Sequence, residues 1–327
     1  MNWTTLLVAM SPEHLLLAGI VVLLAIDSAS DRPRGHLPVA LLAVAGAALA
    51  AALLAISGYA AEPFPAQLSV DSSAFAAKAI VLVLAIPVLL LARDEFPDGP
   101  FYTLLLSSLY GACLILSADS FLTLFLGLEL MSIPVYVLVL LGSRRAFSAE
   151  AALKYVVLGG AATATLLMGI SLLYGHSGSL ALGIFARALA SPDPMAVTGA
   201  VMVLLAFFLK AAVVPFHTWA PDAYEGATVS MTAYMAAIIK AGVLLAALRV
   251  FGTAPVVPPV VGLLAVLPLV SMAWGNLAAL RQVSFRRMIA YSSIAHAGYL
   301  FYALLGDGRG RWEAIVFYLI AYGLMNV

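Results

Sequence analysis

Charged residues are scarce in this chain. Only 10% of its 327 residues are Asp, Glu, Lys or Arg, whereas ordinary soluble domains carry about 25%. The hydrophobic fraction is 64% and the mean hydropathy is +1.08. This balance leaves almost no room for a soluble domain, and the formal net charge of zero gives no electrostatic basis for binding nucleic acid. The composition therefore indicates a polytopic membrane protein in contact with the lipid bilayer.

Cysteine is almost absent as well. The single Cys113 excludes a disulfide, a covalently attached haem and a four-thiolate iron–sulfur site. Its apolar surroundings, YGACLIL, favour a small buried packing residue. The chain also lacks a Gly-rich dinucleotide motif after a strand and a phosphate-binding loop. Any redox or nucleotide chemistry linked to this protein is therefore expected on other chains.

Long apolar runs dominate what is present, and about 20 such residues suffice to cross a bilayer as a helix. The first run lacks the basic region and cleavage site of a signal peptide. The runs are continuous rather than alternating, which excludes barrel strands. We predict an all-α membrane bundle of about eleven transmembrane helices, at 12–26, 37–58, 73–92, 100–118, 119–141, 149–174, 196–218, 227–251, 258–281, 286–305 and 311–327.

Two connecting features complete the predicted topology. The stretch SGSLALGIFARALASPDP is predicted to form a short surface helix ended by Pro192 and Pro194. The chain stops in the apolar run LIAYGLMNV. We therefore expect either a short last helix or an incomplete copy of a longer protein.

The positions of the arginines predict the orientation of the chain in the membrane. Eight fall in the loops after spans one, three, five and nine, and four fall on the opposite side. Positive charge is enriched in cytoplasmic loops, so this bias places the N-terminus outside. The eight are Arg32, Arg34, Arg93, Arg144, Arg145, Arg281, Arg286 and Arg287, and the four are Arg187, Arg249, Arg309 and Arg311.

Lysines behave differently from arginines. All four lie inside apolar segments, whereas every arginine lies in a loop or at a segment end. A desolvated lysine can lose its proton, but arginine stays charged. Lys78 and Lys154 lie about five residues into their spans, so that snorkelling to the interface is an open alternative for both. Lys210 and Lys240 are central, which favours a role in transport over a merely structural one.

One carboxylate lies at a similar depth. Glu129 is ten residues from Asp119, or about 15 Å along a helix, which is half the thickness of the hydrocarbon core. Intramembrane charges usually have partners. We therefore predict that Glu129 pairs with Lys210. Lys154 also follows Glu150 by four residues, which is the spacing of a helical ion pair.

A proline follows Glu129, and another follows Lys210, each in the same apolar segment as the charge. Pro134 follows Glu129 by five residues, and Pro215 follows Lys210 by five. Each proline removes a backbone donor and frees a carbonyl one turn earlier. Broken helices at mid-membrane form ion sites in many transporters, so both prolines are predicted to break their helices.

Histidines supply further titratable groups. His217 lies near the end of its span, and His296 is central in AYSSIAHAGYLFY. Each is interpreted either as a hydrogen-bonded structural residue or as a proton relay. Two separated histidines without a carboxylate cluster do not predict a metal site. Asp222 and Glu225 are predicted to cap or turn the loop after span seven.

Four segments of the chain resemble a known family. They are LGLELMSIPVYVLVLL, EAALKYVVLGGAATATLLMGISLLYGHSGS, FFLKAAVVPFHTWAPDAYEGA and RRMIAYSSIAHAGYLFYALL. Together they resemble the antiporter-like membrane subunits of respiratory complex I, and the YEGA ending is most similar to the N type of bacterial NADH:quinone oxidoreductase. The resemblance covers nearly the whole chain.

The resemblance implies a fold of fourteen helices in the family, with two inverted five-helix repeats and broken helices. It assigns residues 1–99 to three N-terminal helices, 100–251 to the first repeat and 258–327 to an incomplete second repeat. It also assigns Glu129, Lys154, Lys210 and Lys240 to proton translocation. The family's later channel lysine lies beyond Val327, so a truncated sequence is expected.

The implied function is proton pumping driven by redox chemistry elsewhere. NADH, FMN, iron–sulfur clusters and quinone are expected on other subunits, and the partners are other membrane subunits of the complex. The implied location is the bacterial inner membrane, with the N-terminus on the periplasmic side. The alternatives are a stand-alone cation/proton antiporter of the Mrp type, a related M or L subunit, and a scaffold whose lysines only bind helices together.

Overall fold

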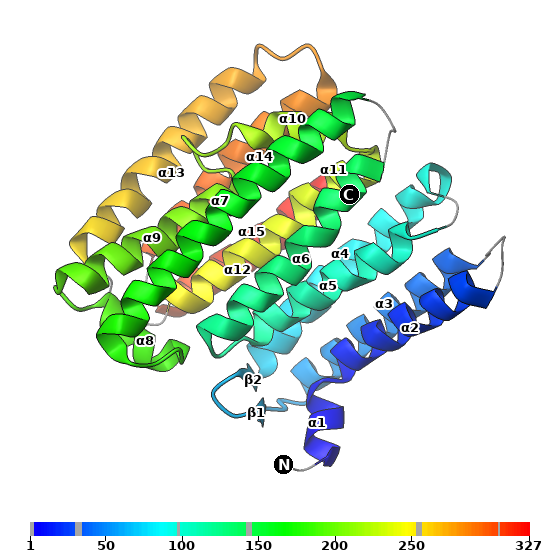
Figure 1. The fold of residues 1–327 in the computed structure, drawn as a ribbon, viewed down its shortest axis with the longest axis horizontal. Helices are drawn as coiled ribbons and strands as arrows, with labels where there is room; N and C mark the ends of the chain where they lie inside the picture. The colour runs from blue at the N-terminus through cyan, green and yellow to red at the C-terminus, as the bar shows by residue number, and fades with distance from the viewer. Residues whose placement is uncertain (1–2, 30–34, 97–98, 142–145, 253–256, 307) are drawn as a thin grey trace. The chain divides into compact units, whose positions relative to one another are not determined.

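The computed structural model describes residues 3–29, 35–96, 99–141, 146–252, 257–306 and 308–327. These residues are almost entirely helical (Figure 1). They divide into two compact units. Within them, nine helices are long and apolar enough to cross a membrane. The predicted all-α membrane bundle is therefore confirmed. The predicted fourth and eleventh spans correspond to the shorter α5 and to α15.

Unit 1 comprises Met1–Gly142, Thr228–Gly242 and Gly323–Val327. In sequence order, it contains α1 (Trp3–Ala9), α2 (Ser11–Ala29), α3 (His36–Ile56), β1 (Ala61–Phe64), β2 (Leu68–Val70), α4 (Ser72–Glu95), α5 (Phe101–Ser117), α6 (Phe121–Leu141), α11 (Val229–Tyr234) and the π-helical turn Met235–Ile239.

Unit 2 comprises Ser143–Ala227 and Val243–Tyr322. It contains α7 (Ala146–Ser177), α8 (Leu182–Leu189), α9 (Pro194–Ala211), α10 (Trp219–Gly226), most of α12 (Lys240–Phe251), α13 (Pro258–Ala279), α14 (Phe285–Tyr302), a 3₁₀ turn (Ala303–Leu305) and most of α15 (Gly308–Asn326).

Glycines permit close helix packing inside each unit. A Cβ on Gly111 of α5 would clash with the backbone of α6 at Met131. A Cβ on Gly169 of α7 would lie 2.9 Å from the carbonyl oxygen of Gly199 in α9. Small residues let membrane helices approach closely where dispersion contacts, rather than the hydrophobic effect, hold them together. These two glycines therefore tighten the α5–α6 and α7–α9 pairs.

An antiparallel hairpin, β1–β2, was not predicted from the sequence. Its strands span only four and three residues, too few for an alternating pattern to stand out. The hairpin contacts the α5–α6 connection through Gln67. The carbonyl of Gln67 accepts a hydrogen bond from the backbone of Asp119 at 2.9 Å, and its side chain accepts one from Ser120 at 2.7 Å.

The predicted short surface helix is present, and Pro192 lies where a terminating proline is expected, whereas Pro194 has another role. The helix exists as α8 and ends at Leu189, before either proline. Pro194 instead begins α9, where its missing N–H removes no helical hydrogen bond. Asp193 caps this start, because its side chain accepts hydrogen bonds from the backbone of Met195 and Ala196.

The predicted division at residues 99 and 251 and the predicted orientation both stay predictions. Four of the arginines behind the orientation, Arg32, Arg34, Arg144 and Arg145, lie outside the described residues, as does the side chain of Arg309.

Candidate functional site

Burial separates the four lysines. Lys78, Lys210 and Lys240 expose 0%, 8% and 5% of their surface. Lys154 exposes 43% of its side chain. An ammonium group taken out of water is costly unless it is paired or gives up its proton. The three buried lysines are therefore the strongest candidates for a functional site.

Lys240 is the first residue of α12 and directly follows the π-helical turn. Such turns are rare and occur frequently at functional sites. The start of the same segment is held by the end of α4. There, the Glu95 carboxylate accepts hydrogen bonds from the backbone N–H groups of Val229 and Ser230 at 2.9 and 3.1 Å. This carboxylate cap positions the helix that leads to Lys240.

Lys210 lies one residue before the end of its helix. The sequence predicted a span to residue 218, but α9 ends at Ala211, and Ala212 turns into the left-handed region at φ 61°. Residues 212–218 form turns, and Pro215 lies within them after a cis peptide bond. The predicted span was therefore too long. The C-terminal end of a helix carries partial negative charge, which is favourable for the Lys210 ammonium.

Two side chains hold the turn that follows Lys210. The indole N–H of Trp219 donates to the carbonyl oxygen of Leu209 at 3.0 Å. The backbone N–H of Val214 donates to the hydroxyl of Ser271 in α13 at 3.3 Å. Polar groups freed at the end of α9 thus find partners inside unit 2, as a chain break within a membrane requires.

Glu129 lies in the middle of α6 and is half-buried. The prediction that Pro134 breaks this helix is wrong, because α6 runs without interruption from Phe121 to Leu141. A membrane helix tolerates one missing backbone hydrogen bond where neighbouring helices and polar side chains compensate. Glu129 belongs to unit 1 and Lys210 to unit 2, and their pairing stays a prediction.

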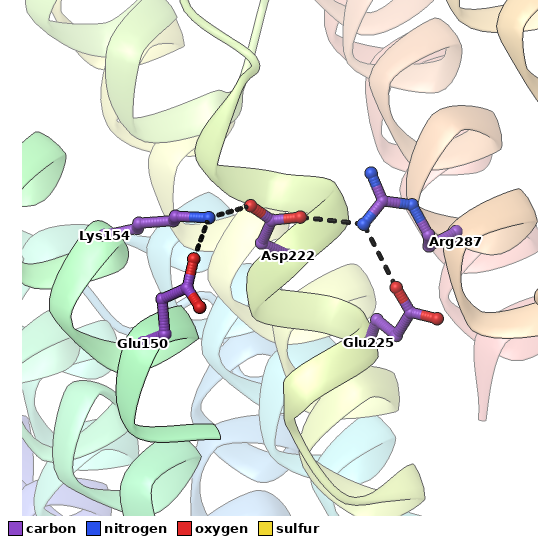
Figure 2. A network of polar contacts seen from close by, with 5 residues as sticks. All are labelled: Glu150, Lys154, Asp222, Glu225 and Arg287. Atoms are coloured by element: carbon purple, nitrogen blue, oxygen red, sulfur yellow. Dashed lines mark hydrogen bonds and ion pairs between the residues drawn. The ribbon is translucent and has the colours of Figure 1, made fainter. Parts of the chain in front are cut away.

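Lys154 takes part in an ionic network with α10 and α14 (Figure 2). Its Nζ lies 2.7 Å from Glu150 and 2.7 Å from Asp222. On the other side of α10, Nη1 of Arg287 lies 2.7 Å from Asp222 and 3.0 Å from Glu225. Of these five side chains, Asp222 alone contacts both cations. The network links α7 to α14 through α10.

The network confirms the predicted ion pair of Glu150 and Lys154 and corrects the prediction for Asp222 and Glu225. Asp222 and Glu225 do not cap a loop; they lie on α10 and bind cations of neighbouring helices. Burial alone would raise the pKa of Asp222, but hydrogen bonds from Lys154 and Arg287 outweigh it and lower that pKa below its ordinary value. Asp222 is therefore held as a carboxylate between the two cations.

Both histidines have aromatic partners in unit 2. Nε2 of His217 accepts a hydrogen bond from the indole of Trp274 at 3.0 Å. Nδ1 of His296 lies 2.6 Å from the hydroxyl of Tyr318, and the His296 ring lies 4.5 Å from that of Tyr322. Both interpretations, structural residue and proton relay, are compatible with these contacts. Within the described residues, no three His, Cys, Asp or Glu side chains gather as a metal site would require.

The sequence interpretation missed a buried ion pair. Lys78 does not snorkel: its Nζ lies 2.6 Å from Oε1 of Glu13, and both side chains are only 1% exposed. The one signal in the sequence was Glu13 itself, a carboxylate at the start of an apolar run. Nothing in the sequence linked it to a lysine 65 positions away.

Comparison with known proteins decides the family. The model of the family described as "NADH:quinone oxidoreductase/Mrp antiporter, TM" matches residues 118–327. The subunit N of NADH-quinone oxidoreductase from Pelobacter propionicus is 36% identical, over 99% of this chain and 70% of the relative. The chain belongs to the NADH-quinone oxidoreductase subunit N family. The subunit N of Granulibacter bethesdensis, 37% identical over 100% of this chain and 69% of its own length, agrees.

Solved structures that are similar to this chain have the same fold. Respiratory complex I from Thermus thermophilus with bound aureothin contains a chain that is 34% identical. It covers 96% of this chain and 69% of its own length, with a TM-score of 0.83. The Mrp complex from a Dietzia species has a TM-score of 0.86 at 20% identity, covering 99% of this chain and 63% of its own, and therefore shows the fold alone. The family predicted from the four sequence segments is thus confirmed.

Proposed function

We propose that this chain translocates protons as an antiporter-like membrane subunit of NADH:quinone oxidoreductase. The observation that carries the proposal is the burial of Lys210 and Lys240 at irregular points of their helices in a member of the subunit N family. A buried lysine at a helix break or beside a π-helical turn is an expensive arrangement that packing alone does not need.

In the proposed mechanism, Lys210 and Lys240 hold the proton in turn, and Glu129 is the counter-charge of Lys210. A charged Glu129 favours the ammonium form of Lys210. When a neighbouring subunit weakens that attraction, the buried ammonium loses its counter-charge and releases the proton toward Lys240. Moving one proton against about 200 mV costs about 4.6 kcal/mol, at about 2.3 kcal/mol per 100 mV. Loss of a partner by a buried charge is worth about 3–5 kcal/mol, which is of the same order.

The remaining groups take supporting roles in this proposal. His217 and His296 act as relays, and Lys154 supplies an entrance group within its ionic network. Pro215 keeps the segment after Lys210 out of helix. The redox steps, with NADH, FMN, iron–sulfur clusters and quinone, take place on other subunits. The chain spans the bacterial inner membrane with its N-terminus on the periplasmic side and contacts the neighbouring membrane subunits of the complex.

Substitution of the buried lysines tests the proposal. In the assembled enzyme, Lys210→Ala and Lys240→Ala should each lower the protons pumped per NADH oxidised by about two-fold or more, because a proton-transfer group is lost. Assembly and NADH oxidation must be measured separately from pumping. The conservative variant Lys210→Arg is the control for charge, because arginine keeps its proton; it should lower pumping to a similar extent.

Two outcomes would contradict the proposal. Normal proton pumping by an assembled Lys210→Ala enzyme would mean that the lysines only hold helices together. Cation/proton exchange by the isolated chain in vesicles, without NADH, would favour a stand-alone antiporter instead.

A further inference from the structure

A second acid–base arrangement lies in the N-terminal helices, away from the residues used above. Glu13 is in the first turn of α2 and Lys78 is in α4, and both helices belong to unit 1. Nζ of Lys78 lies 2.6 Å from Oε1 of Glu13, and each side chain is 1% exposed. The pair is therefore a fully buried ion pair in an apolar bundle.

Stability does not explain why such a pair is present. Desolvating two charges costs about as much as their attraction returns, and apolar residues of similar volume often serve equally well or better. The chain is 64% hydrophobic, so an apolar pair would match its surroundings. Intramembrane ionisable groups are expensive, and function is their default interpretation.

The carboxylate of Glu13 is only half satisfied. Oε2 of Glu13 is buried and accepts no hydrogen bond from the described residues. Such an oxygen is costly as it stands, and it is the position at which a proton can attach. The neighbouring titratable groups are His14, the next residue on α2, and Tyr110 and Cys113 on α5, which interact electrostatically with Glu13. Nε2 of His14 is also buried and has no hydrogen-bond partner among the described residues.

The ammonium of Lys78 also lies over an aromatic ring. Nζ of Lys78 lies 5.1 Å from the ring centre of Phe75, one turn earlier on α4. A ring at this distance stabilises the ammonium form. Lys78 therefore keeps a favourable contact even when Glu13 becomes neutral, so the pair has two accessible charge states.

We propose that Glu13 and Lys78 form a further acid–base site of proton translocation in the N-terminal helices. In the resting pair, Glu13 is a carboxylate and Lys78 an ammonium. A proton from water at the end where α2 and α4 begin attaches to Oε2 and makes Glu13 a neutral acid, while Lys78 stays an ammonium. Release of that proton to water on the other side of the membrane breaks the new O–H bond and restores the ion pair, and no other bond changes. This inference rests on the proposed function.

Two variants in the assembled enzyme test the site. Glu13→Gln keeps the shape of the side chain but cannot carry the proton. The double variant Glu13→Leu with Lys78→Met removes both charges and keeps an apolar, packed pair, which should preserve folding. Both are expected to lower the protons pumped per NADH by about two-fold or more. Glu62→Gln, which changes an exposed carboxylate of β1, is the matched control and should pump normally.

A spectroscopic readout separates proton exchange from packing. Infrared difference spectra, recorded before and after adding NADH, should show a protonated-carboxyl band that is absent in Glu13→Gln and present in Glu62→Gln. If the double variant assembles and pumps like the wild type and Glu13→Gln keeps the band, the pair is structural and the inference is wrong. If Lys210→Ala also pumps normally, the proposed function itself has failed; if only the Glu13 variants do, this inference alone has failed.

Discussion

Two lysine–carboxylate contacts of nearly equal length lie in opposite surroundings. Lys78 and Glu13 are 2.6 Å apart with both side chains 1% exposed, whereas Lys154 and Asp222 are 2.7 Å apart with side chains 43% and 20% exposed. Distance alone would rank them as equals. Burial separates them, because water and salt screen the second contact and not the first. Breaking the buried pair leaves an uncompensated charge, and breaking the exposed one does not.

The largest effect is expected from removing one partner of the buried pair. Lys78→Ala should destabilise the chain by about 3–5 kcal/mol, because Glu13 is left as a buried, unpaired carboxylate. Thermal unfolding of the purified protein in detergent micelles measures this. The double variant Glu13→Leu with Lys78→Met should restore most of the loss. A double variant as unstable as Lys78→Ala would mean that cavities rather than charge cause the effect.

A smaller effect is expected from removing the central carboxylate of the ionic network. Asp222→Asn should cost about 1 kcal/mol, because it weakens two partly exposed contacts at once. The same unfolding measurement in about 0.1 M and about 1 M NaCl sharpens the comparison, since the screening length falls from about 10 to about 3 Å. High salt should shrink the Asp222→Asn effect and leave the Lys78→Ala effect unchanged. Equal salt dependence of the two would contradict the assignment by burial.

The smallest expected effect is a change in the stability contributed by Asp222 that occurs only at acidic pH. The pKa of Asp222 is lowered in the folded protein, so its contribution is fully present above the ordinary carboxyl pKa of about 3.9. That contribution is lost as the pH falls through the lowered pKa. The stability difference between wild type and Asp222→Asn should therefore be constant above about pH 5 and decline below about pH 4. A difference that grows on acidification would have the wrong sign.

Much of the fold could be predicted because the signals were local. The positions of the predicted spans follow from runs of apolar residues, and most helix ends agree within a few residues. The errors lie where contacts with a neighbouring element, rather than the local sequence, determine whether a helix ends or continues. The turn after Ala211 is held by Trp219 and Ser271, and α6 continues through Pro134 because a single missing bond is tolerated.

The candidate site shows the same division. The sequence by itself determined which ionisable residues lie inside apolar segments. It therefore selected Lys210, Lys240 and Glu129. The reason is that hydropathy depends only on residues near one another along the chain. Tertiary structure alone decided that Lys78 is buried against Glu13 and that Lys154 is bound by Asp222. Those partners lie 65 and 68 positions away, on other helices. Burial and charge pairing are properties of packed neighbours, which no local pattern contains.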